Sequence, residues 1–172
     1  MAEDTKTGRT NSGAPPGQAQ GPEFAIQKIY IKDLSFEAPG APAGFLKEWK
    51  GETNVQLNTK ARALSGQDGV FEVELGVTVT TSNQGETAYL VEVKQAGVFV
   101  ARGFPPDQHG HLLGAYCPNL LFPFVREVVA DMVLKGGFPQ LLLQPINFDA
   151  LYLQHQQEQR GALAGEAGPA TA

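Results

Sequence analysis

Three residues that lie close together in the sequence, His109, His111 and Cys117, carry side chains that could ligate a metal ion or act in nucleophilic chemistry. Zinc accepts imidazole and thiolate ligands, but a structural zinc site needs four of them, and no fourth ligand follows at a suitable spacing. Cys117 precedes the expected start of a helix, where the helix dipole can stabilise a thiolate. A cysteine nucleophile also needs a base and an orienting group, and no motif supplies them.

We therefore expect a packed cysteine, solvated histidines, no metal, no cofactor and no catalysis. An enzyme built on Cys117 with His109 or His111 is the less favoured alternative. The sequence contains no glycine-rich phosphate-binding motif and no GxSxG nucleophile motif. These observations indicate a binding protein rather than an enzyme.

The charge balance is acidic, with 13 Lys and Arg residues against 18 Asp and Glu residues and a formal net charge of −5. No basic stripe is present, so the electrostatic footprint of a nucleic-acid-binding protein is missing. A single cysteine excludes an internal disulfide and fits a reducing compartment. The first residues do not resemble a signal peptide, and no apolar run is long enough to span a membrane. We expect a cytoplasmic protein without nucleic-acid partners or membrane insertion.

The residues that could do chemistry lie in or just before the longest predicted helix of the chain. This helix starts at Pro118, which suits a first helical position, and stops at Gly136 and Gly137. Residues 101–116 before it are expected to form a loop. The apolar residues of the helix come in adjacent pairs four apart: Leu120/Leu121, Phe124/Val125, Val128/Val129 and Met132/Val133. A stripe this broad predicts contact with the protein's own sheet and with another subunit, the alternative being a fully buried helix in a monomer.

Four stretches alternate between apolar and polar residues, as strands do. They cover residues 24–37, 54–64, 70–82 and 86–100. A long Pro/Gly-rich connection with Phe45 and Trp49 joins the first two, and an amphipathic helix over 147–159 follows the long helix. We expect an α+β fold: a four-stranded antiparallel sheet with a long crossover loop and two helices packed on one face.

Period-two alternation assigns side chains to the two faces of the sheet. In the first strand it places Tyr30, Leu34 and Phe36 together, opposite Asp33, Ser35 and Glu37. In the fourth strand it places Val91, Val93 and Gln95 opposite Leu90 and Glu92. In the third strand, Glu72 and Glu74 are expected to point to solvent.

The two ends of the chain differ in composition from the rest. Residues 1–23 and 160–172 are rich in Gly, Ala, Pro and polar residues without periodicity, so we expect both tails to be disordered. The folded domain is therefore expected to cover residues 24–159.

Three long segments resemble the SecB family, the tetrameric export chaperone of Gram-negative bacteria. They are IYIKDLSFEAP (29–39), HLLGAYCPNLLFPFVRE (111–127) and FPQLLLQPINFDALY (138–152). The resemblance implies protomers that pair into an eight-stranded sheet and a dimer of dimers with the long helices between the sheets. It also implies a chaperone that binds non-native precursor proteins and delivers them to the SecA ATPase, without a cofactor. Some members of the family serve toxin–antitoxin systems, so a narrowed client set is the alternative.

The resemblance also implies roles for individual residues. The SecA-binding acidic patch of the family corresponds to Asp33, Glu37, Leu90 and Glu92. Candidates for the client-binding groove are Phe45, Trp49 and Tyr116. Positions that affect assembly correspond to Val91, Val93 and Gln95, and Phe124 and Val128 are the expected helix residues of the subunit interface.

Overall fold

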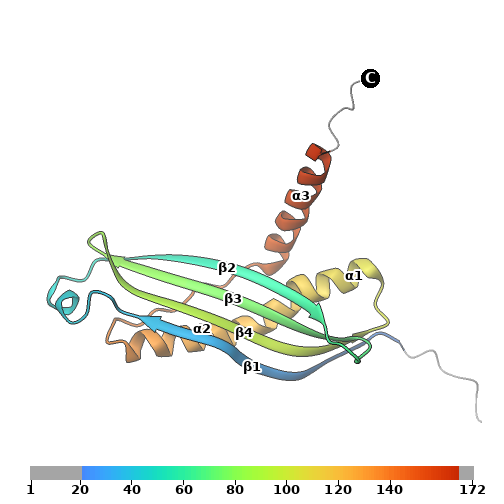
Figure 1. Ribbon diagram of the computed structural model, residues 1–172, viewed down its shortest axis with the longest axis horizontal. Helices are drawn as coiled ribbons and strands as arrows, with labels where there is room; N and C mark the ends of the chain where they lie inside the picture. The colour runs from blue at the N-terminus through green and yellow to red at the C-terminus, as the bar shows by residue number, and fades with distance from the viewer. Residues whose placement is uncertain (1–20, 167–172) are drawn as a thin grey trace, which may run out of the picture.

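A computed structural model describes residues 21–166 as one antiparallel sheet with helices on one side (Figure 1). The strands are β1 (Glu23–Glu37), β2 (Gly51–Ala63), β3 (Val70–Asn83) and β4 (Glu86–Arg102). The helices are α1 (Pro106–His111), α2 (Cys117–Lys135) and α3 (Phe148–Glu166). The strand order is β1-β4-β3-β2. Because β1 and β2 lie at opposite edges, the segment 38–50, with its short 3-10 helix Ala43–Leu46, crosses the end of the sheet. The predicted α+β fold and its crossover loop are confirmed.

Helix α2 covers one face of the sheet and closes the core. Its buried residues Leu121, Val125 and Val129 recur every four positions, so they form one row along the helix. This row packs on the side chains that β3 and β4 direct to the same face, such as Leu75 and Val93. We call this the helix face of the sheet and the opposite side the outer face.

The alternation predicted for β1 is wrong at one position. Its pairing with β4 shifts between Ile31 and Asp33, so Lys32 is an extra residue in a β-bulge. The bulge resets the alternation: Leu34 contacts the core, whereas the hydroxyl of Tyr30 donates a hydrogen bond to Glu72 on the outer face. Tyr30 therefore lies on the opposite face from Leu34, because period two does not hold across an inserted residue.

The segment before α2 is helical and not the expected loop. Helix α1 begins at Pro106 and continues through one π-helical stretch, Leu112–Tyr116, directly into α2. Proline at the first helical position fits this start. A Cβ atom on Gly110 or Gly114 would come within 2.8 Å or 2.6 Å of the Tyr152 side chain, so these glycines allow α3 to approach closely.

The end of α2 agrees with the predicted stop, since Gly136 caps it and Gly137 has a φ of 84°. Helix α3 follows, with the side chain of Asn147 accepting a hydrogen bond from the amide of Ala150 at 3.0 Å. Its first turns pack mainly on the helices rather than on the sheet, through Phe148 against Phe122 (ring centroids 5.7 Å apart). The rest of α3 projects away from the sheet (Figure 1).

The boundaries of the predicted domain differ slightly from the structure. Strand β1 begins at Glu23, one residue inside the predicted N-terminal tail. Helix α3 continues to Glu166, seven residues beyond the predicted end, because Ala, Leu and Glu in this stretch favour helix. The rest of the two predicted tails, residues 1–20 and 167–172, lies outside the described residues. No helix within residues 21–166 is long and apolar enough to cross a membrane.

Candidate functional site

The four residues expected to bind SecA lie together at one end of the outer face. Opposite each other in the pairing of β1 with β4 are Glu37 and Leu90, Ser35 and Glu92, and Asp33 and Lys94. The Asp33 carboxylate lies 3.6 Å from the ammonium group of Lys94. Within residues 21–166, Glu37 and Glu92 are exposed and have no basic side chain at ion-pair distance. The end of the face that carries them therefore presents uncompensated negative charge.

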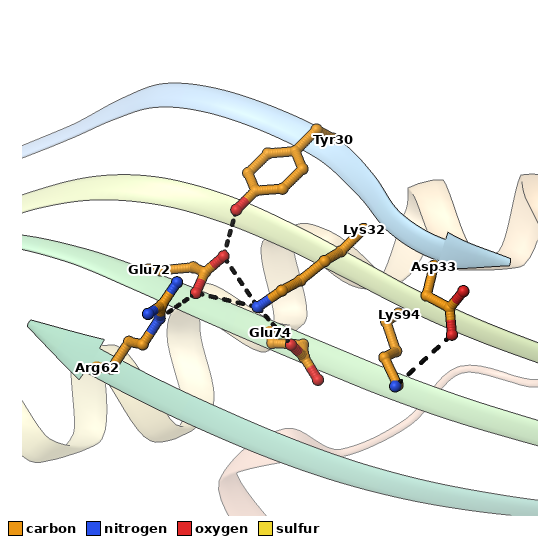
Figure 2. Close-up of polar contacts among 7 residues, drawn as sticks. All are labelled: Tyr30, Lys32, Asp33, Arg62, Glu72, Glu74 and Lys94. Atoms are coloured by element: carbon orange, nitrogen blue, oxygen red, sulfur yellow. Dashed lines mark hydrogen bonds and ion pairs between the residues drawn. The ribbon is translucent and has the colours of Figure 1, made fainter. Parts of the chain in front are cut away.

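A second group of charged residues, on the same face, was not expected to be buried. Figure 2 shows Glu72 between Tyr30, Lys32 and Arg62, with Glu74 beside Lys32. Tyr30 and Arg62 both donate to the Glu72 carboxylate, and the Lys32 ammonium lies 3.2 Å from Glu72 and 3.0 Å from Glu74. Only 4% of Glu72 and 8% of Glu74 remain exposed. The bulge at Lys32, which alternation does not reveal, brings the lysine over both carboxylates.

This pairing changes the acid–base properties of the group. The hydrogen bonds from Arg62 and from Tyr30 lower the pKa of the Glu72 carboxyl to about 2, despite the opposing effect of burial. Burial, and then the neighbouring Glu72, raise the pKa of the Tyr30 hydroxyl. At neutral pH Glu72 is thus a carboxylate held by two cations and a phenol.

The crossover loop places Phe45 and Trp49 in an aromatic cluster at the end of α2. Their rings lie 5.1 Å and 5.7 Å from the ring of Phe138, which is itself 4.9 Å from Tyr89. Phe45 is 49% exposed and Trp49 is 39% exposed. Both line a shallow pocket together with Phe138. The loop is thus pinned by its aromatic residues, yet they keep a large apolar surface in contact with solvent.

Tyr116 lies at the other end of α2, against Phe24 (ring centroids 5.4 Å apart). A helix of 19 residues is about 28 Å long, so one compact site cannot contain Tyr116, Phe45 and Trp49. Tyr116 lines a hollow between α2 and the segment 139–147, bordered by Pro145 and Ile146. A second hollow shares these two residues and continues along α2 to Leu142. The structure therefore contains an elongated groove at Tyr116 and a separate aromatic pocket at Phe45 and Trp49.

The five residues expected at a subunit interface fall into two groups. Val91, Val93 and Gln95 are buried on the helix face, beneath the protein's own α2. Gln95 donates to the carbonyl oxygen of Tyr30 at 2.9 Å, and its own side-chain oxygen is buried without a hydrogen-bond partner in the described part of the chain. Phe124 is 41% exposed and Val128 is half-buried, one turn further along α2. Only the helix residues are accessible to a second subunit in this structure.

The residues considered for metal or nucleophilic chemistry are buried or contact other side chains in the structure. Cys117 is fully buried, and burial raises the pKa of its thiol to about 12. A thiol of this kind stays protonated at neutral pH and cannot attack a substrate. His109 packs edge-on against Phe71 at 4.8 Å, and His111 bonds to the Asp149 carboxylate at 2.7 Å. Residues 21–166 contain no group of three or more metal-ligating side chains.

Comparison with known proteins assigns the family. Residues 17–159 match the family model for SecB, the preprotein translocase subunit SecB. The protein-export protein SecB of Thioalkalivibrio sulfidiphilus is 60% identical over 159 residues, which cover 91% of this chain and 94% of the relative. That of Nitrosococcus oceani is 53% identical over 168 residues, covering 96% and 98%.

A solved structure shares the fold at low sequence identity. It is the SecB-like chaperone of Mycobacterium tuberculosis in complex with a peptide from an antitoxin, with a TM-score of 0.60 and 16% identity, covering 72% of this chain and 90% of that one. Such a likeness supports the architecture and carries no residue roles. On the family model and the close relatives together, this chain belongs to the SecB family of protein-export chaperones.

Proposed function

We propose that this chain holds non-native precursor proteins in the cytoplasm, keeps them competent for export and delivers them to SecA. The observation that best supports this proposal is that an aromatic surface and an acidic surface lie on different sides of the protein. Exposed aromatic side chains and a groove lined partly by apolar residues lie on the side of the helices, whereas uncompensated carboxylates lie on the outer face of the sheet. A protein with this arrangement can hold a client on one side and a second protein on the other.

Client binding is assigned to Phe45, Trp49 and Tyr116. An unfolded chain exposes apolar side chains, and a surface of aromatic and aliphatic groups binds them with little sequence preference. Phe45 and Trp49 keep large exposed areas in the aromatic pocket, and Tyr116 lines the groove along α2. Because the two sites lie at opposite ends of α2, a bound client would be an extended segment that follows the helix.

SecA binding is assigned to Asp33, Glu37, Leu90 and Glu92. Opposite charge accelerates the encounter with a basic partner and makes the contact sensitive to salt. Leu90 lies opposite Glu37 on the same face, so it adds an apolar contact beside the carboxylates. The uncompensated state of Glu37 and Glu92 supports this assignment, because a basic partner does not have to displace an internal ion pair.

Assembly as a homotetramer, a dimer of dimers, is assigned to the outer side of α2. Phe124 and Val128 leave apolar surface exposed there, which a second subunit would cover. The buried residues Val91, Val93 and Gln95 would act indirectly, because they support the position of α2 from below.

Catalysis is not part of this proposal, since the SecB family is a chaperone family and Cys117 is buried and protonated. A narrowed role beside a toxin–antitoxin system is less well supported. The two relatives described above, which are 60% and 53% identical to this chain, are both named as protein-export proteins. The complex with an antitoxin peptide belongs to a protein that shares the fold alone.

Size-exclusion chromatography with light scattering tests the function directly. The chain is run alone, with an export precursor freshly diluted from denaturant, and with the same precursor after folding. We expect a tetramer that captures the unfolded precursor and ignores the folded one. A monomer that captures neither form would contradict the proposal.

Two variants separate the surfaces. Trp49→Ala is expected to weaken client capture and leave SecA binding intact, with Leu153→Ala on α3 as a control for the loss of an exposed apolar side chain. Glu92→Lys is expected to abolish SecA binding and leave client capture and the tetramer intact, with Glu158→Lys on α3 as the control. Unchanged client capture in Trp49→Ala, or unchanged SecA binding in Glu92→Lys, would show that the residue is not part of the proposed binding surface.

A further inference from the structure

The outer face of the sheet carries opposite charges at its two ends. Strand pairing places Lys28, Glu72 and Arg62 in one row across the sheet, through Val98 of β4. The adjacent row on this face pairs Lys60 with Glu74. Together with Lys32 of the bulge, these two rows contain four basic and two acidic side chains, so their formal charge is 4 − 2 = +2.

The surface of this end is more basic than the formal count suggests. Both carboxylates, Glu72 and Glu74, are buried under their partners and are hardly accessible to another molecule. Lys28 and Lys60 are exposed, and neither has an acidic side chain at ion-pair distance within residues 21–166. An incoming protein would therefore meet ammonium and guanidinium groups there.

The other end presents three exposed carboxylates beside the apolar Leu90. Glu37 and Glu92 lie there, and Glu52 of β2 lies on the same face, two residues from Asn54, which pairs with Thr80. All three are exposed and lack a basic partner in the described residues, which gives a charge of −3. The Asp33–Lys94 pair forms the inner border of this end and adds no net charge to it. Along β3 the row of Lys60 and the row of Glu92 are four residues apart, or about 13 Å.

We propose that the outer face is a bipolar docking surface, and that Lys28, Lys60 and Arg62 bind an acidic segment of the same partner whose basic segment contacts Glu37 and Glu92. This inference rests on the proposed docking of SecA at the acidic end and adds a second contact. Charge complementarity selects the partner: a protein segment with basic and acidic stretches about 13 Å or more apart fits both ends. A uniform polyanion such as a nucleic acid is repelled by the carboxylates of the acidic end.

The double variant Lys28→Glu with Lys60→Glu reverses the charge of two lysines. Whether SecA binding becomes weaker or stronger then decides whether the basic end binds an acidic segment. Arg62 is left unchanged because it holds the buried Glu72. If the basic end binds an acidic segment, the double variant weakens SecA binding by roughly threefold to tenfold at low salt, as expected for two exposed ion pairs. If the partner is only basic, the added negative charge strengthens binding instead. Unchanged or strengthened binding would overturn the inference.

Lys135→Glu is the matched control, since this exposed lysine lies on α2, on the other side of the sheet. It is expected to leave SecA binding unchanged, and light scattering confirms that each variant keeps the assembly of the parent protein. A fluorescent decaglutamate peptide tests the basic end without SecA. We expect salt-sensitive binding to the parent protein and its loss in the double variant, and equal binding to both, or to neither, would overturn the inference.

The two proposals fail in different ways. If Glu92→Lys leaves SecA binding unchanged, the acidic end is wrongly assigned, while the decaglutamate result still reports on Lys28 and Lys60. If Glu92→Lys abolishes binding and the lysine double variant does not weaken it, the acidic end stands and the bipolar surface is rejected.

Discussion

The two faces of the β-sheet bury their side chains by different means. On the helix face, residues such as Leu75 and Val93 are covered by a second layer, helix α2. On the outer face, Glu72 and Glu74 are almost as inaccessible, yet no helix within residues 21–166 covers them. The long side chains of Tyr30, Lys32 and Arg62 cover them instead. Alternation along a regular strand, away from a bulge, thus predicts the face of a residue but does not predict its exposure.

The physical cost of burial differs accordingly. An apolar residue on the helix face gains stability as its surface leaves water. A carboxylate loses hydration, and it stays buried only because cations and hydrogen-bond donors replace the water. The helix face is therefore expected to be sensitive to side-chain volume, and the covered part of the outer face to charge.

Leu75→Ala tests the helix face and has the largest expected effect. Leu75 is fully buried, so the change removes its contacts and leaves a cavity. We expect the free energy of unfolding, measured by urea titration at pH 7 and fixed protein concentration, to fall by about 3 kcal/mol. Thr78→Val is the control in the same strand on the outer face, expected to stay within about 0.5 kcal/mol. Equal losses in the two variants would contradict the distinction between the faces.

Much of the fold is predictable because its signals are local. Alternation within each strand and the proline and glycine at the ends of α2 depend on neighbouring residues. The helical segment around Pro106 and the bulge at Lys32 were missed for a physical reason. The helical segment 106–116 is supported by contacts with α3, such as the close approach of Gly110 and Gly114 to Tyr152, and the bulge is supported by pairing with β4. Neither partner is visible in the local sequence.

The candidate site was predictable to different degrees. The pairing of β1 with β4 brings Glu37, Leu90 and Glu92 together, as regular strands require. The large separation of Tyr116 from Trp49 was not predictable, because no local pattern shows at which end of α2 the crossover loop packs. The cover over Glu72 was missed because it joins residues from three strands, and only the register reveals it.

Glu72→Gln tests the outer face. The change removes the negative charge that Arg62 and Lys32 share, so a buried amide faces two cations. We expect the free energy of unfolding, measured by urea titration, to fall by about 1–2 kcal/mol. This is less than for a fully buried ion pair, because both cations are partly exposed to solvent. The control is Glu92→Gln, whose carboxylate has no cation at ion-pair distance in the described residues, with an expected change within about 0.5 kcal/mol. If Glu72→Gln leaves the free energy of unfolding unchanged, the ion pairs of Glu72 with Arg62 and Lys32 contribute no stability.

The smallest expected effect is the pH dependence of this contribution. The pKa of Glu72 is lowered from 4.5 to about 2 in the folded protein, so the unfolded chain binds its proton first as the pH falls. The stabilisation is therefore complete above about pH 5 and is lost as the pH falls from 4.5 towards 2, with about half gone by pH 3. Because other carboxyl groups titrate in the same range, the quantity to measure is the difference in unfolding free energy between the parent protein and Glu72→Gln. We expect this difference to shrink by about half, or about 0.5–1 kcal/mol, between pH 5 and pH 3. A constant difference would show that the charge of Glu72 does not stabilise the outer face.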